Sequence, residues 1–265
     1  MSGYDLNNCP VETKMQVSNI KDFLIDNLCG NLIGIYIHGS MCLGSFQPSH
    51  SDLDIIVITQ TPLNADQRFN LMKGFLELHK KPSPIELSIL CISELIPWRH
   101  PTPYEFHFSE YWRSKFEVIA EENDLGYWNF KEVYTDGDIA CHVTLINQSG
   151  ICIYGRAICE VFPPVPEKDF WDSIFWGVDY FSKLDGELLV TGILTLLRIW
   201  SYKKNKAIFS KARAGEWSIG RIPSQYNYIV QNAVDVYNGK DEIQHYEPSD
   251  LEGLKQFTIR QITEL

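Results

Sequence analysis

Three apolar runs in the first half of the chain have the length and composition of buried β-strands. They span residues 32–38 (LIGIYIH), 52–59 (DLDIIVIT) and 85–92 (IELSILCI). Between the last two runs, Asn64 opens a stretch with helical periodicity, and Gln67 follows three residues later, as in a capping box. Strand, helix and strand therefore follow one another, which is the order of an α/β domain.

From about Asp138 onward, the apolar pattern changes from the period of strands to the period of helices. Apolar residues recur at three- and four-residue spacing, and strand signals nearly vanish. Between the halves, IPWRHPTPYEFHF is rich in proline and aromatic residues and predicts an ordered connection. We therefore predict a domain over residues 1–133, which includes this connection, and a helical bundle over residues 134–265. The predicted bundle helices are 138–147, 168–184, 186–203 and 210–219.

The composition is that of a globular protein without disulfides. Hydrophobic residues make up 45% of the 265 residues and charged residues 22%, which argues against extended disorder. The seven cysteines are odd in number, scattered and never in a CxxC pair, so the pattern suits neither a disulfide framework nor a zinc site. No apolar run is long enough for a membrane span, and the N-terminus lacks a signal-peptide pattern. We expect a cytoplasmic protein that does not engage a membrane, and we expect a monomer.

The net charge of −11 argues against some classes of binding partner and in favour of others. A nucleic-acid backbone would meet mainly repulsion, so nucleic acid is not an expected partner. The local basic cluster at Lys203–Lys206, with Lys211 and Arg213 nearby, fits a nucleoside triphosphate better than a long polyanion. The acidic remainder of the chain favours a cationic substrate.

The most informative segment is IYIHGSMCLGSFQPSHSDLDIIVI. Side chains alternate along a strand, so Asp52 and Asp54 project from the same side, about 7 Å apart along the backbone. The pair stands at the start of the apolar run 55–58, where two like charges are costly unless a cation neutralises them. Hard oxygen ligands select magnesium or manganese, and such a metal can neutralise triphosphate oxygens during nucleotidyl transfer.

The residues around this pair strengthen the interpretation. An isolated DxD is most often a turn or a solvated surface pair. Here Gly39-Ser40 precede Asp52 by eleven residues and offer a close backbone approach and free N–H donors to phosphate, and Ser51 adds a hydroxyl. Glu86 lies inside the third apolar run, where a charge is unexpected. It is a candidate metal ligand or general base, and the alternative is a strand-edge carboxylate in a structural salt bridge.

On these motifs, the chain resembles the DNA polymerase β nucleotidyltransferase superfamily and, within it, the adenylyltransferases that inactivate streptomycin and spectinomycin. The superfamily signature, GS followed by DxD, is present as Gly39, Ser40, Asp52 and Asp54. The closer resemblance runs through IELSILCISELIPWRHPTPYEFHFSEYWR and ILTLLRIWSYKKNKAIFSKARAGEW. It implies an α+β fold, with an N-terminal nucleotidyltransferase domain of a mixed sheet and flanking helices, a C-terminal helical domain, and ATP and antibiotic bound between them.

The resemblance also implies roles for individual residues. Glu86 matches the position of the catalytic base of that family, and Arg198, Lys211 and Tyr237 match positions that contact ATP. From the residues alone, a solvated lysine and an ion-paired helix arginine are equally good interpretations of Lys211 and Arg198.

The acceptor contacts depart from the streptomycin-modifying members. Those members carry a tryptophan where this chain has Tyr111, followed here by Trp112. They also carry an acid and a histidine where an ungapped alignment gives Leu188 and Thr191, and one gap brings in Glu187 as the acid. Spectinomycin-type specificity is therefore favoured over streptomycin.

The sequence thus predicts a Mg²⁺-dependent transfer of AMP from ATP to a hydroxyl of an aminoglycoside or aminocyclitol antibiotic. Asp52, Asp54 and Glu86 are the expected catalytic and metal-binding residues. Two alternatives are a nucleotidyltransferase that acts on a protein or an RNA end, and a catalytically idle nucleotide-binding regulator.

Overall fold

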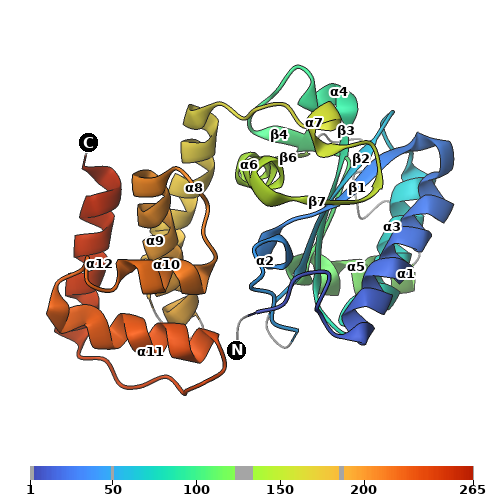
Figure 1. Ribbon diagram of the computed structural model, residues 1–265. Helices are drawn as coiled ribbons and strands as arrows, with labels where there is room; N and C mark the ends of the chain where they lie inside the picture. Colours follow the sequence, from blue (N-terminus) through green and yellow to red (C-terminus); the bar gives the residue numbers. More distant parts are fainter. Residues whose placement is uncertain (1–2, 49–50, 123–133, 185–187, 265) are drawn as a thin grey trace. The chain divides into compact units, whose positions relative to one another are not determined.

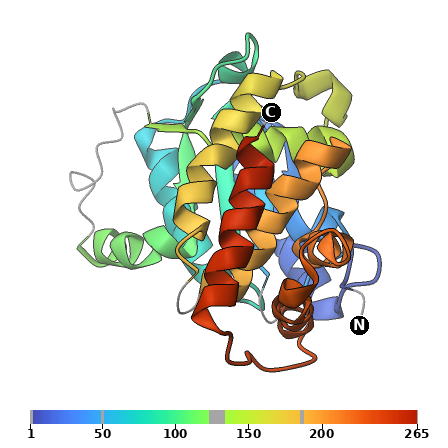
Figure 2. The ribbon, with the colours of Figure 1, turned by 90° about the vertical axis from the view of Figure 1, so that its left-hand side faces the viewer.

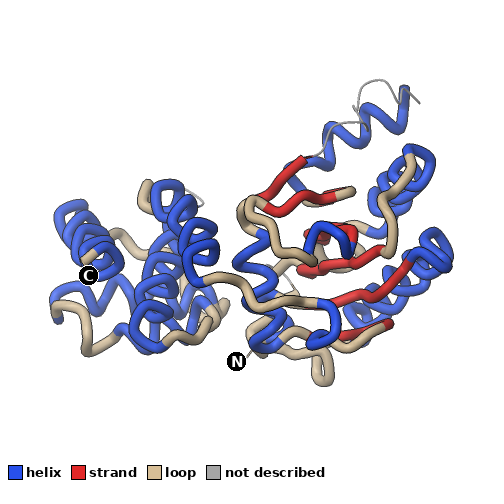
Figure 3. Tube along the Cα trace, turned by 90° about the horizontal axis from the view of Figure 1, so that it is seen from above, coloured by secondary structure: helices blue, strands red, loops and turns tan. Residues whose placement is uncertain are grey.

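A mixed sheet and a separate group of helices make up the protein. In the computed structural model, the described residues are 3–48, 51–122, 134–184 and 188–264. Two compact units divide the chain, Tyr4–Phe170 and Trp171–Leu265, coloured blue to yellow and gold to red in Figure 1. Within the described residues, strands occur only in the first unit, as Figure 3 shows in red.

The main sheet has five strands in the order β5-β3-β2-β1-β7. The central strands β2 and β3 run parallel, whereas β1 is antiparallel to both β2 and β7, and β5 is antiparallel to β3. A second, two-stranded sheet pairs β4 with β6. The strands are β1 (Leu32–Ile37), β2 (Leu53–Thr59), β3 (Ile85–Cys91), β4 (Thr102–Tyr104), β5 (Phe106–Phe108), β6 (Tyr134–Asp136) and β7 (Ile151–Gly155).

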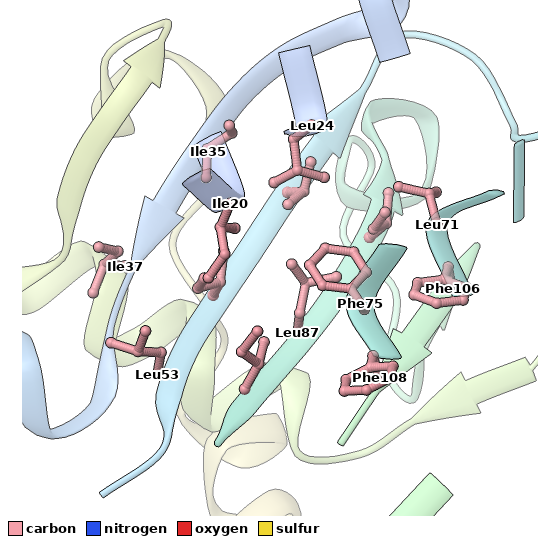
Figure 4. Packing of buried hydrophobic residues seen from close by; sticks show 14 of the residues in the cluster. Ile20, Leu24, Ile35, Ile37, Leu53, Leu71, Phe75, Leu87, Phe106 and Phe108 are labelled. Carbon is pink, nitrogen blue, oxygen red and sulfur yellow. The ribbon is translucent and has the colours of Figure 1, made fainter. Parts of the chain in front are cut away.

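One face of the main sheet is covered by α1 (Val11–Leu28), α3 (Ala65–Leu78) and α5 (Glu110–Glu122). Alternate residues of each strand point toward these helices and form a continuous apolar core with them. Figure 4 shows this packing, in which Phe75 of α3 lies against Phe106 and Phe108 of β5. This face of the sheet is therefore a packed apolar core.

The opposite face carries a smaller core beneath α4 (Ile92–Leu95), α6 (Ile139–Ser149) and α7 (Ile158–Val161). Tyr36, Ile56 and Leu90 from three strands form its floor. The short helix α2 (Gly39–Cys42) follows β1 at the end of the sheet where β2 and β3 begin.

The regular elements of the second unit, among its described residues, are all helices. Helix α9 (Leu188–Asn205) packs against α10 (Lys211–Ser218), α11 (Asn227–Tyr237) and α12 (Pro248–Thr263), and the later part of α8 (Glu167–Phe181) completes the same apolar core (Figure 2). Ser210 caps α10 by accepting a hydrogen bond from the Arg213 N–H at 3.3 Å. No helix among the described residues combines the length and apolar character that a membrane crossing needs.

The predicted fold class is confirmed, and so are the three strands and the helix between them. The capping box is present in full: the Asn64 side chain accepts from the Gln67 N–H, and the Gln67 side chain accepts from the Asn64 N–H. The four predicted helices of the second half correspond to α6, α8, α9 and α10. The Pro-rich connection is ordered and contributes β4 and β5.

The expected boundary at 133/134 differs from the division that the structure shows. Helix α6 and strand β7 lie beyond that boundary, yet both belong to the first unit. The reason is that β7 pairs with β1 and α6 covers the sheet, so the helical period of residues 138–147 reflects packing on a sheet and not on other helices.

Candidate active site

Two carboxylates on neighbouring strands face the same side of the sheet. Asp54 of β2 and Glu86 of β3 are register partners in the parallel ladder. Ile56, two residues after Asp54, lies in the core beneath α6, so by strand alternation both acids point to that face. Both residues are half-buried, and Asp52, one residue before β2, has the same parity and a similar exposure. The expected adjacency of the strands that carry these acids is observed.

The Gly39-Ser40 turn lies directly against Asp54. The His38 N–H donates to the Asp54 carbonyl at 3.0 Å, which brings the end of β1 to the start of β2. Gly39 has a φ of +65°, and a Cβ at this residue would lie 1.6 Å from Asp54 Oδ2. Only glycine satisfies both the backbone conformation and the contact. Among the described residues, the buried Ser40 hydroxyl has no hydrogen-bond partner, as expected for a group that awaits a ligand.

Ser51, predicted to contact ATP, has a structural contact that the sequence did not indicate. Its hydroxyl accepts from the Gln47 N–H at 3.0 Å, and its own N–H donates to the Gln47 carbonyl at 2.8 Å. The side chain is buried and closes the loop that leads into Asp52. Ser51 therefore shapes this loop, and its contact with ATP stays a prediction.

Three histidines on the same face of the sheet were not among the predicted site residues: His38 is buried, and His107 and His142 are half-buried. The ring of His38 lies 4.7 Å from that of His142 on α6, and burial, with His142, holds the pKa of His38 well below its usual value. Ser88 Oγ lies 2.9 Å from His107 Nδ1, and burial lowers the pKa of His107 to about 4, with Asp136 opposing the shift. His38 and His107 are therefore neutral at physiological pH.

The sequence did carry a signal for the position of Ser88. Ser88 stands two residues after Glu86, so strand alternation places both on one face. Its partner His107 comes from β5, and only the pairing of β3 with β5 brings the two together.

The three acids suit a metal ion that binds together with a nucleotide better than a metal ion held by protein ligands alone. Among the described residues, no group of three or more His, Cys, Asp and Glu side chains forms a site that could hold a metal ion. Mg²⁺ in nucleotide sites typically keeps several waters and takes one or two carboxylates plus phosphate oxygens. The hard oxygens of Asp52, Asp54 and Glu86, on the same side as the Gly39-Ser40 turn, fit that mode. Their assignment as metal ligands stays a prediction.

In the second unit, two of the three residues expected to contact ATP lie together. Lys211 is the first residue of α10, and its Nζ lies 5.8 Å from the ring centroid of Tyr237, the last residue of α11. Arg198 lies on α9, which packs against both helices, and its carbonyl accepts from the Ser201 hydroxyl at 2.8 Å. All three side chains are half-buried.

The predicted acceptor residues differ in their environments. Tyr111 is 84% exposed near the start of α5, and its ring meets the Trp112 ring edge-on at 5.3 Å. Trp112 is half-buried and stacks on Phe116, so part of its surface belongs to the core. Glu187 lies outside the described residues.

Known proteins resemble this chain over nearly its whole length. Residues 160–261 match the family model described as the aminoglycoside adenylyltransferase C-terminal domain. An aminoglycoside (3'')(9) adenylyltransferase from Escherichia coli is 28% identical over 87% of this chain and 87% of that protein. A spectinomycin 9-adenylyltransferase from Campylobacter jejuni is 24% identical over 96% of this chain and 97% of that protein.

The fold has a solved counterpart. The crystal structure of a spectinomycin adenyltransferase from Enterococcus faecialis, determined with ATP and spectinomycin, matches with a TM-score of 0.78 at 24% identity, covering 95% of this chain and 99% of that one. In sequence the chain is thus similar to aminoglycoside adenylyltransferases, and it shares the fold of this spectinomycin adenyltransferase.

Proposed function

We propose that the protein transfers AMP from ATP to a hydroxyl of an aminoglycoside or aminocyclitol antibiotic and releases pyrophosphate. The observation that carries this proposal is the register pairing of Asp54 with Glu86 on one sheet face, beside the Gly39 turn. Two acids beside a glycine turn suit nucleotidyl transfer, because the reaction depends on positioning and charge neutralisation. The names of the relatives supply the class of acceptor.

Each residue has a distinct task in this mechanism. Asp52 and Asp54 would hold Mg²⁺, with Glu86 beside them; when bound, the ion would neutralise the charge that develops on the phosphates. Gly39 and Ser40 contact the phosphates through their backbone N–H groups and the Ser40 hydroxyl. Glu86 accepts the proton of the acceptor hydroxyl, whose oxygen then bonds to the α-phosphorus as the bond to pyrophosphate breaks.

The second unit supplies cationic and aromatic contacts to ATP. Lys211 offers an ammonium to the triphosphate, and Tyr237 holds the lysine stem in place through the cation–π contact. Arg198 on the neighbouring helix adds a second positive charge. The cluster is local within a chain of net charge −11.

The acceptor is expected to be cationic, and spectinomycin is favoured over streptomycin. The net negative charge attracts amines. Tyr111 and Trp112 offer aromatic surface to the antibiotic, and Glu187 a carboxylate. The positions Leu188 and Thr191 lack the acid and histidine of streptomycin-modifying relatives.

A panel of acceptors tests this function. The protein is incubated with ATP, Mg²⁺ and spectinomycin, streptomycin or other aminoglycosides separately, and mass spectrometry looks for the gain of one adenylyl group. Modification of spectinomycin but not streptomycin is the expected result. ATP binding by calorimetry without modification of any antibiotic would point instead to another acceptor or to an idle nucleotide-binding protein.

A further inference from the structure

A buried histidine outside the candidate active site joins two elements that carry site residues. His79 follows α3 directly, and its side chain is buried. Its Nδ1 accepts a hydrogen bond from the Ile85 N–H at 3.0 Å, and its Nε2 lies 2.5 Å from Glu110 Oε2. A backbone N–H only donates, so Nδ1 is unprotonated and Nε2 carries the proton that it donates to the carboxylate.

Both partners of His79 stand at the first residue of an element. Ile85 begins β3, and the next residue is Glu86, the register partner of Asp54. Glu110 begins α5, and the next residues are Tyr111 and Trp112. A single imidazole therefore connects the strand of the proposed base with the helix of the proposed acceptor contacts.

The Glu110 carboxylate, one of the two partners of His79, keeps its negative charge. Burial alone would raise the pKa of Glu110, but hydrogen bonds from Lys80, His79 and Arg113 outweigh it and lower the pKa to about 2. Lys80 and Arg113 are partly exposed, at 51% and 35%, whereas the His79 side chain is 2% exposed. His79 is therefore the one of these three donors that is shielded from solvent, although the Glu110 carboxylate is itself 45% exposed.

The loop between His79 and β3 is also held by the buried side-chain amide of Gln16. Gln16 of α1 donates to the Leu78 and Ser83 carbonyls at 3.1 and 2.8 Å and accepts from the Ser83 N–H at 3.0 Å. With the loop fixed at Ser83, two hydrogen bonds hold the start of β3. The Leu53 N–H donates to the Pro84 carbonyl at 2.8 Å, and the Ile85 N–H donates to His79.

We propose that His79 is a positioning residue: its Nδ1 sets the start of β3, and so the place of Glu86 beside Asp54, while its Nε2 sets the start of α5 and the Tyr111-Trp112 pair. This rests on the proposed function, since Glu86 and the aromatic pair take their roles from it. His79 itself touches no reacting group.

Two isosteric substitutions separate the two bonds. In His79→Asn, the amide oxygen takes the place of Nδ1, so the Ile85 bond is kept and the Glu110 bond is lost. In His79→Gln, the longer amide reaches Glu110, and the Ile85 bond is lost. We expect His79→Gln to lower kcat about tenfold or more with little change in KM, because a small displacement of the base is costly. We expect His79→Asn to raise the KM of the acceptor several-fold with kcat nearly unchanged.

Two further variants test whether the changes in kcat and KM come from the lost hydrogen bonds or from a general disturbance of the buried ring. Glu110→Ala removes the partner at an exposed position and should reproduce the KM effect of His79→Asn while leaving the buried ring intact. Glu117→Gln is the matched control, because Glu117 also pairs with Arg113 on α5, at 2.5 Å, but does not touch His79. It should leave kcat and KM as in the unaltered protein.

Amide hydrogen exchange gives a readout that needs no turnover. The Ile85 amide should exchange faster in His79→Gln and stay protected in His79→Asn. Equal exchange in both variants, or kcat and KM that change together in both, would overturn the positioning role. If the unaltered protein transfers no AMP to any acceptor, the proposed function fails, and the exchange of the Ile85 amide still decides whether His79 holds the start of β3.

Discussion

The two faces of the main sheet differ in what their side chains do. On the face covered by α1, α3 and α5, the strands contribute a continuous apolar core. On the other face, Ile56 and Leu90 pack beneath α6, but Asp54 stands two residues before Ile56, and Glu86 and Ser88 stand four and two residues before Leu90. One pair of strands thus carries core residues on one face and the proposed catalytic acids on the other, so we expect stability and turnover to change separately.

The largest expected effect is the loss of turnover in Glu86→Gln. The amide keeps the volume and one acceptor oxygen but cannot take a proton, so kcat should fall by about 10²–10⁴-fold. Calorimetry should show ATP binding unchanged, and the melting temperature should stay close to that of the unaltered protein. Glu77→Gln, an exposed acid on α3, serves as the control. Turnover that survives the Glu86 change would remove the general-base assignment.

The neighbouring residue tests the opposite face. Leu87 follows Glu86 directly but points into the core with 0% exposure. Leu87→Ala should lower the free energy of unfolding by about 3 kcal/mol, since it removes buried methyl groups and leaves a cavity. Denaturant unfolding measures this loss, and kcat of the folded fraction should fall far less than in Glu86→Gln. If Leu87→Ala abolished turnover without destabilising the protein, the two faces would not be separable as described.

The smallest effect concerns pH and the buried His107. Its pKa is lowered to about 4, mainly by burial with a contribution from His142, against the usual 6.5. The unfolded chain therefore binds a proton that the folded one does not between about pH 4 and 6.5, and stability falls as the pH drops through this window. From pH 7 to 5.5, this residue should account for about 1 kcal/mol. His107→Asn, whose amide oxygen can still bond Ser88, should reduce that slope in unfolding curves measured at each pH.

Much of this architecture was predictable because it depends on local pattern. The three apolar runs and the Asn64 capping box act over a few residues, and they were confirmed. The parity of Asp52 and Asp54 and the apolar setting of Glu86 were enough to place the acids on strand ends. Helix α1 was missed because its buried side includes the polar Thr13 and Gln16, which weaken the helical pattern.

What escaped prediction depends on pairing between distant residues. Strands β4, β5 and β6 have three residues each, too few to show a period. The contact of Ser88 with His107 and that of His79 with Glu110 join residues 19 and 31 positions apart. Neither partner carries a local signal for the other, so only the tertiary fold reveals them.

The pairing of β1 with β7 has a consequence for how the protein is made. Strand β1 ends at residue 37, and its outer neighbour is not synthesised until residues 151–155 emerge. Until then, the hydrogen-bonding edge of β1 next to the Gly39 turn is open to other chains, which is where partly folded proteins aggregate. A chain that ends before residue 151 would contain Asp52, Asp54 and Glu86 but would lack β7, so this edge of β1 would stay exposed.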